Sequence, residues 1–80
     1  MSTLKKIQET FHETFGVSIN SVNENTDIHN LNEWDSLKHL QLIMNIEKKF
    51  SVKFEMAEII LINSVIGIKN ALESKGKTID

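Results

Sequence analysis

Apolar residues recur at helical spacing in several stretches of the chain. In the first, over residues 3–15, they return every three or four positions, at Leu4, Ile7, Phe11 and Phe15. This spacing gives one apolar face, so we predict an amphipathic helix that ends at Gly16. Residues 17–35 then form a 19-residue connection with five asparagines, a residue typical of turns.

A second helix is predicted from Asp35 or Ser36 to about Phe50, and Asp35 is a good N-cap because its carboxylate can accept from the unpaired N–H groups of the first turn. At 100° per residue, one apolar stripe on this helix faces a core, and a second apolar group adjoins Ser36. The stripe consists of Leu42, Ile43, Ile46 and Phe50, and the second group of Leu37, Leu40 and Met44. Deep burial of the whole helix would explain this excess of apolar surface, and so would a docking face for partner proteins.

Two further helices complete the predicted fold. A short link over residues 51–55 leads to a short helix near Met56–Leu61, and Ser64 caps a last helix from Val65 to about Ser74. We therefore predict an all-α fold: a small four-helix bundle of three main helices and one short helix, with a long loop between helices 1 and 2. Eighty residues make a single domain, 1–80, with residues 77–80 as a frayed tail.

The composition excludes several classes of function. The chain has no cysteine, so it forms no disulfide or zinc–thiolate site and cannot hold a thioester on its own side chains. A net charge of −2 argues against nucleic-acid binding, which needs a clear basic face. The most apolar stretch, 59–68, is far shorter than the ~20 residues of a membrane span. With no apolar signal segment at the N-terminus, we expect a cytoplasmic protein without membrane insertion.

Ser36 has several interpretations. A serine in the first turn of a helix usually caps that helix. Asp35, Ser36 and His39 together suggest nucleophilic catalysis, but no oxyanion hole or strained turn accompanies them, so we predict no enzyme. His12 and His29 have no partners at ligand spacing, so we also predict no metal site.

The run that begins Trp34-Asp35-Ser36-Leu37 resembles the attachment site of acyl carrier proteins. The resemblance covers nearly the full chain: a helix, a long loop, the Asp35-Ser36-Leu37 motif, a second helix ending Glu47-Lys48-Lys49-Phe50, and a closing helix from Ser64-Val65. The three-residue motif is weak by itself, but the motif, the helix after it and the total length together are specific.

This resemblance implies a carrier that is not itself an enzyme and acts as a monomer. A phosphopantetheinyl transferase, using coenzyme A and Mg²⁺, would attach 4′-phosphopantetheine covalently to Ser36. Asp35 would engage the transferase, and Leu37 would enter an apolar pocket of it. The arm's thiol would then hold acyl or aminoacyl groups as thioesters for acyl-loading and acyl-using enzymes (synthases, acyltransferases or ligases). Docking residues would be Leu37, Lys38, Leu40, Gln41, Met44, Glu47 and Lys48.

Trp34 precedes the second helix at the N′ position. The simplest interpretation is a hydrophobic staple, in which Trp34 packs on the first turn of that helix. The alternative is a contact with the prosthetic arm or with a partner protein.

The charge of the second helix departs from that of fatty-acid carriers, in which this helix is strongly acidic. Its polar side here carries Lys38, Gln41, Asn45, Lys48 and Lys49, with Glu47 as the lone acid. Because electrostatic complementarity selects partners, we predict a specialised carrier that serves polyketide, nonribosomal-peptide, lipid or surface-glycan pathways. Two alternatives stay open: a housekeeping fatty-acid carrier, and a non-carrying helical interaction module in which Ser36 only caps its helix.

Overall fold

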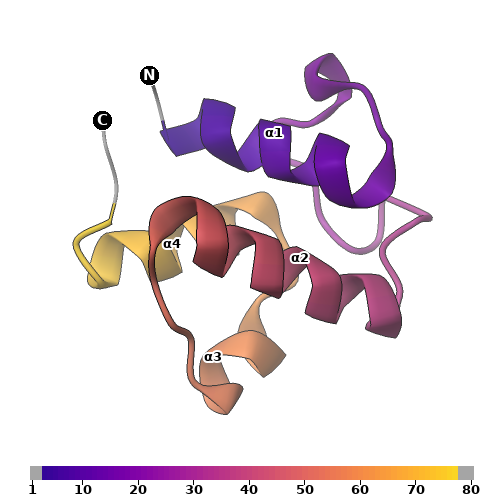
Figure 1. Cartoon of the computed structure of the whole chain (residues 1–80). Coiled ribbons are helices and arrows are strands. Elements are labelled where there is room, and N and C mark those ends of the chain that lie inside the picture. The colour runs from indigo at the N-terminus through magenta and orange to yellow at the C-terminus, as the bar shows by residue number, and fades with distance from the viewer. Residues whose placement is uncertain (1–2, 78–80) are drawn as a thin grey trace.

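The computed structural model describes residues 3–77, and within that range the secondary structure is helical. The elements are α1 (Thr3–Phe15), the 3-10 helix η1 (Ile19–Ser21), α2 (Ser36–Phe50), α3 (Met56–Leu61) and α4 (Val65–Ser74). Figure 1 shows α1 and α2 alongside each other in opposite directions, with α4 below α1 and partly behind α2, and the short α3 below α2. The predicted all-α four-helix bundle is confirmed.

A glycine with a positive φ follows both α1 and α4. Gly16 follows α1 with φ +75°, a left-handed conformation that glycine adopts without steric cost. After α4, Gly76 has φ +70°, its N–H donates to Glu73 O, and the N–H of Lys77 donates to Leu72 O. This pair of bonds is a Schellman motif. Lys77 therefore closes α4 and does not begin a frayed tail, and residues 78–80 of the predicted tail lie outside the described residues.

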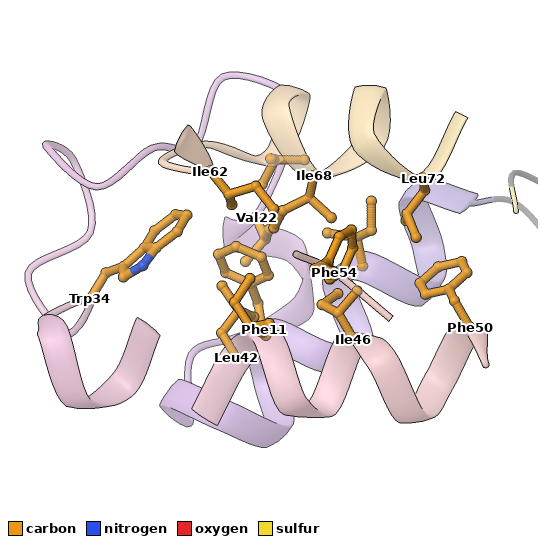
Figure 2. Close-up of a cluster of buried hydrophobic side chains, with 13 residues drawn as sticks. Phe11, Val22, Trp34, Leu42, Ile46, Phe50, Phe54, Ile62, Ile68 and Leu72 are labelled. Carbon is orange, nitrogen blue, oxygen red and sulfur yellow. The ribbon is translucent and has the colours of Figure 1, made fainter. Parts of the chain in front are cut away.

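The core collects one apolar face from each long helix (Figure 2). The predicted stripe of α2 is buried, and so are Val65, Ile68 and Leu72 of α4, each at 0% exposure. The buried hydrophobic residues are Ile7, Phe11, Val22, Trp34, Leu42, Ile43, Ile46, Phe50, Phe54, Ile62, Val65, Ile68 and Leu72. The sequence pattern thus orients α2 correctly, with Ser36 at the exposed start of the helix.

The long connection is held to the core at several points. Val22 is 1% exposed, and Val17, Ile28 and Leu31 pack partly buried against the core. Two main-chain hydrogen bonds, here called the loop–α4 pairing, join this connection to the start of α4: Val65 N–H donates to Thr26 O (2.9 Å), and Ile28 N–H donates to Asn63 O (2.9 Å). The connection therefore leads to the start of α2 along a fixed path.

No helix among residues 3–77 is long and apolar enough to cross a membrane.

Candidate functional site

The first turn of α2 exposes Ser36 and is capped by its neighbour. Asp35 has extended backbone angles, and its carboxylate Oδ1 accepts a hydrogen bond from Lys38 N–H at 2.9 Å. Asp35 is therefore the N-cap, and Ser36 is the first residue inside the helix. The interpretation of Ser36 as a capping residue is wrong, because the capping position is already occupied.

The hydroxyl of Ser36, unlike that of most other described serines, forms no hydrogen bond with residues 3–77. Among the serines of residues 3–77, Ser18 and Ser64 accept backbone N–H groups, and Ser21 and Ser74 donate to backbone carbonyls. Ser36 is exposed, and its hydroxyl bonds to no described residue. Among these serines, only Ser51 is also exposed without such a bond. The two lie at opposite ends of α2, so the helix dipole favours an anion at Ser36 and disfavours one at Ser51.

The second apolar group of α2 lies at the surface. Leu37, Leu40 and Met44 are 66%, 53% and 56% exposed, whereas the core stripe of the same helix is buried. Deep burial of the whole helix is therefore wrong as an explanation. Contiguous exposed apolar side chains on a soluble domain are typical of an interaction surface.

An apolar groove of about 370 Å³ adjoins Ser36 on the side of α3. Leu40 and His39 of α2 form one wall, and Met56, Ile59 and Ile60 of α3 form the other. Ile28 of the long connection and Ile62, which follows α3, line this groove as well. Ser36 thus adjoins both this groove and the exposed second apolar group of α2 (Leu37, Leu40 and Met44).

Trp34 packs on the start of α2 and also joins it to α1. Its indole is 4% exposed and contacts the rings of Phe11 (centroids 5.3 Å apart) and Phe15 (6.0 Å). On α2 it meets His39, whose ring is nearly parallel to the indole at 5.9 Å. His39 is the fourth residue of α2, so this contact is the predicted staple, here with a histidine as partner. Figure 2 shows the indole beside the first turn of α2.

His39 also makes two polar contacts that the sequence did not predict. Trp34 Nε1 donates to His39 Nδ1 at 2.9 Å, and His39 Nε2 lies 2.8 Å from the carbonyl oxygen of Ile59 in α3. Together these contacts are called the His39 bridge below. The apolar periodicity of α2 does not identify the partners of His39, and only the tertiary structure reveals them.

Charge on the polar side of α2 is partly neutralised within the fold. Lys49 Nζ lies 3.7 Å from Glu9 and 3.1 Å from Glu13, and Lys38 Nζ donates to Thr14 O at 3.3 Å. The Glu47 carboxylate accepts from Phe54 N–H at 2.8 Å, which ties the link after α2 back to the helix. The lone acid of this side thus already has a structural partner.

The far end of α2 keeps free positive charge. A shallow hollow of about 530 Å³ is lined there by Met44, Glu47, Lys48, Ser51, Val52 and Lys53. Lys48 and Lys53 are exposed and form no hydrogen bond or ion pair with residues 3–77. The exposed second apolar group of α2 therefore extends from Ser36 toward the positively charged C-terminal end of the helix.

One carboxylate near the groove has a perturbed pKa. The pKa of Glu58 in α3 is lowered, first by the hydrogen bond that Glu55 N–H donates to it at 2.8 Å and then by Lys75, whose Nζ lies 3.0 Å away. These contacts hold α3 to its own N-cap and to the end of α4. Within residues 3–77, no cluster of three or more histidines or acids has the arrangement of a metal site.

Comparison with known proteins agrees with this geometry. None of the curated proteins compared matches the chain. The family model described as "Phosphopantetheine attachment site" matches residues 5–72, which include most of α1, all of α2 and α3, and most of α4. Domains of this family are the attachment sites of the covalent prosthetic group 4′-phosphopantetheine. The match spans most of the 80 residues, and so this chain belongs to the family of phosphopantetheine-bearing carrier proteins.

Proposed function

We propose that Ser36 carries the 4′-phosphopantetheine arm and that the chain presents acyl or aminoacyl groups to enzymes of a specialised biosynthetic pathway. When bound, the arm supplies a thiol on which such a group is held as a thioester. The chain itself would perform no catalysis. The observation that carries the proposal is the free, exposed Ser36 hydroxyl at the start of α2, inside a chain of the phosphopantetheine family.

The surroundings of Ser36 fit a phosphodiester-linked arm. The hydroxyl has no intramolecular partner to lose among the described residues, and its position at a helix N-terminus favours the phosphate charge. The groove beside it offers apolar walls to the less polar parts of an arm or its cargo. One carboxylate oxygen of Asp35 accepts a hydrogen bond from Lys38 N–H, and this bond orients the side chain. The other carboxylate oxygen would then be available to a transferase.

The same helix supplies a docking face. We define it by the predicted residues Leu37, Lys38, Leu40, Gln41, Met44, Glu47 and Lys48, all on α2. Leu37, Leu40 and Met44 provide exposed apolar anchors, and Met44 is a flexible side chain that adapts to different partners. The transferase and the acyl-handling enzymes would share this face.

The charge of this face supports a specialised pathway. Glu47 bonds to the Phe54 N–H, and Lys48 remains an exposed cation, so the face offers little negative charge to a basic enzyme surface. Enzymes that select acidic carriers would lose electrostatic steering toward it. Support of ordinary fatty-acid elongation at normal efficiency would contradict this part of the proposal.

The direct test is the intact mass of the protein before and after incubation with coenzyme A and a broad-specificity phosphopantetheinyl transferase. We expect the wild type to gain one phosphopantetheine group and Ser36→Ala to gain none. Ser51→Ala is the matched control, because Ser51 is the other exposed serine with a free hydroxyl, and it should load like the wild type. A folded wild type that gains no mass would favour a non-carrying interaction module.

A further inference from the structure

The partners of His39 fix which of its nitrogens carries the proton. Trp34 Nε1–H is a donor only, so the nitrogen that it contacts, Nδ1, must accept. The Ile59 carbonyl oxygen is an acceptor only, so Nε2 must donate to it. Both bonds form together only in the neutral imidazole with its proton on Nε2.

The Ile59 carbonyl belongs to a helix that the core holds weakly. No residue of α3 is buried, and Met56, Ile60 and Leu61 are 68%, 72% and 78% exposed. Ile59 is also within the last four residues of α3, where carbonyls lack intrahelical partners. The bond from His39 satisfies one of these carbonyls and ties α3 to the first turns of α2.

The His39 bridge crosses the site described above. Its imidazole and Ile59 both line the groove that adjoins Ser36, from opposite walls. On the other side of the ring, Trp34 packs against Phe11 and Phe15, so the bridge is anchored on α1. One side chain thus links α1, α2 and α3 at the groove.

We propose that His39, as the Nε2–H tautomer, is a positioning residue that holds α3 against α2 and thereby sets the separation of the groove walls beside Ser36. A role for His39 in a carrier rests on the proposed function, because the width of the groove affects the arm only if Ser36 bears it. The bridge itself is a property of the protein without the arm and is testable in that state.

Two variants of one residue separate the two bonds. The side-chain amide of His39→Gln reaches about as far as Nε2 and can still donate to Ile59 O. The amide oxygen of His39→Asn lies near the position of Nδ1, so it can accept from Trp34 but is too short for α3. Both variants lose the ring and keep one amide, so each is the control for the other.

The readouts are hydrogen exchange of the α3 amides and the emission of Trp34, which is the single tryptophan. The informative amides are Ile59 N–H, bonded to Glu55 O, and Ile62 N–H, bonded to Glu58 O. In His39→Asn, we expect the exchange rates of these amides to rise about two- to tenfold, which is the factor for the loss of one hydrogen bond. In His39→Gln, the exchange rates should stay near those of the wild type. Trp34 emission should shift more in His39→Gln than in His39→Asn.

A second measurement needs no variant. Long-range ¹H–¹⁵N correlation of the His39 ring should show a protonated Nε2 and an unprotonated Nδ1. The opposite tautomer, or equal acceleration of α3 exchange in the two variants, would overturn the proposal. These results are independent of loading, so a failed bridge leaves the assignment of Ser36 intact, and failed loading leaves the bridge intact.

Discussion

Asp35 and Ser36 are adjacent, yet alanine at position 35 should destabilise the fold, whereas alanine at position 36 should leave its stability nearly unchanged. Asp35→Ala removes the carboxylate that accepts from Lys38 N–H at 2.9 Å and leaves that N–H without a protein partner at the start of α2. Ser36→Ala removes a hydroxyl that bonds to no described residue and places a strong helix former at the first helical position.

The magnitudes follow from these contacts. Loss of an N-cap side chain costs about 1 kcal/mol, within a range of about 0.5–2 kcal/mol. A domain of this size has a free energy of unfolding of roughly 4–12 kcal/mol, so Asp35→Ala should remove about a tenth to a quarter of it. The midpoint of thermal unfolding should fall by about 4–8 °C per kcal/mol. Ser36→Ala should change the free energy of unfolding by less than about 0.5 kcal/mol.

Urea unfolding followed by far-ultraviolet circular dichroism measures both values on the same scale. Trp34 fluorescence offers a second probe of the same transition, since its indole is buried at 4% exposure. A loss of 1 kcal/mol or more in Ser36→Ala, or an unchanged Asp35→Ala, would refute the assignment of the cap. If the prediction holds, Ser36→Ala is a clean control for loading, because it lacks the hydroxyl and keeps the fold.

Three further predictions concern pH, the core and the docking face. The pKa of Glu58 is lowered from 4.5 by the Glu55 N–H and Lys75, so ionised Glu58 stabilises the fold above the unfolded-state pKa, and this contribution is lost as pH falls through the lowered folded-state pKa. The difference in urea midpoint between wild type and Glu58→Gln should therefore shrink from neutral pH to pH ~3, and a constant difference would contradict this. Leu42→Ala, at a fully buried position, should cost about 2–5 kcal/mol in the same assay, and a cost below about 1 kcal/mol would place Leu42 outside the core. Met44→Ala should leave stability within about 0.5 kcal/mol but slow loading by the transferase. Ile66→Ala, an exposed apolar change on α4, is its control, and equal slowing in both would argue against the docking face.

Local features of the fold were predictable from the sequence because their causes are local. The apolar period of α2 identified its buried stripe, and the Asp35 cap acts on a residue only three positions away. The family resemblance, which rested on the order of such elements, is confirmed by the family match. The attachment role of Ser36 and the docking face remain predictions.

Contacts between distant segments were not predictable in this way. The Ile59 carbonyl is 20 positions from His39 and lacks an intrahelical partner because α3 ends at Leu61. From the sequence, Glu47 is the lone acid on the polar side of α2, but in the structure the link after α2 folds back and brings the Phe54 N–H to its carboxylate. Periodicity reports which face of a helix is buried, and it carries no information about which backbone group will lie opposite a polar side chain.

The loop–α4 pairing has a consequence for proline substitution, in a chain that contains no proline. Val65 is the first residue of α4, a position where proline is normally well tolerated because the N–H there has no helical partner. Here that N–H donates to Thr26 O, so proline at residue 65 would break the bond between the long connection and α4. Met56, the exposed first residue of α3, has no such bond among residues 3–77. Rigidifying substitutions are therefore better placed at the start of α3 than at the start of α4.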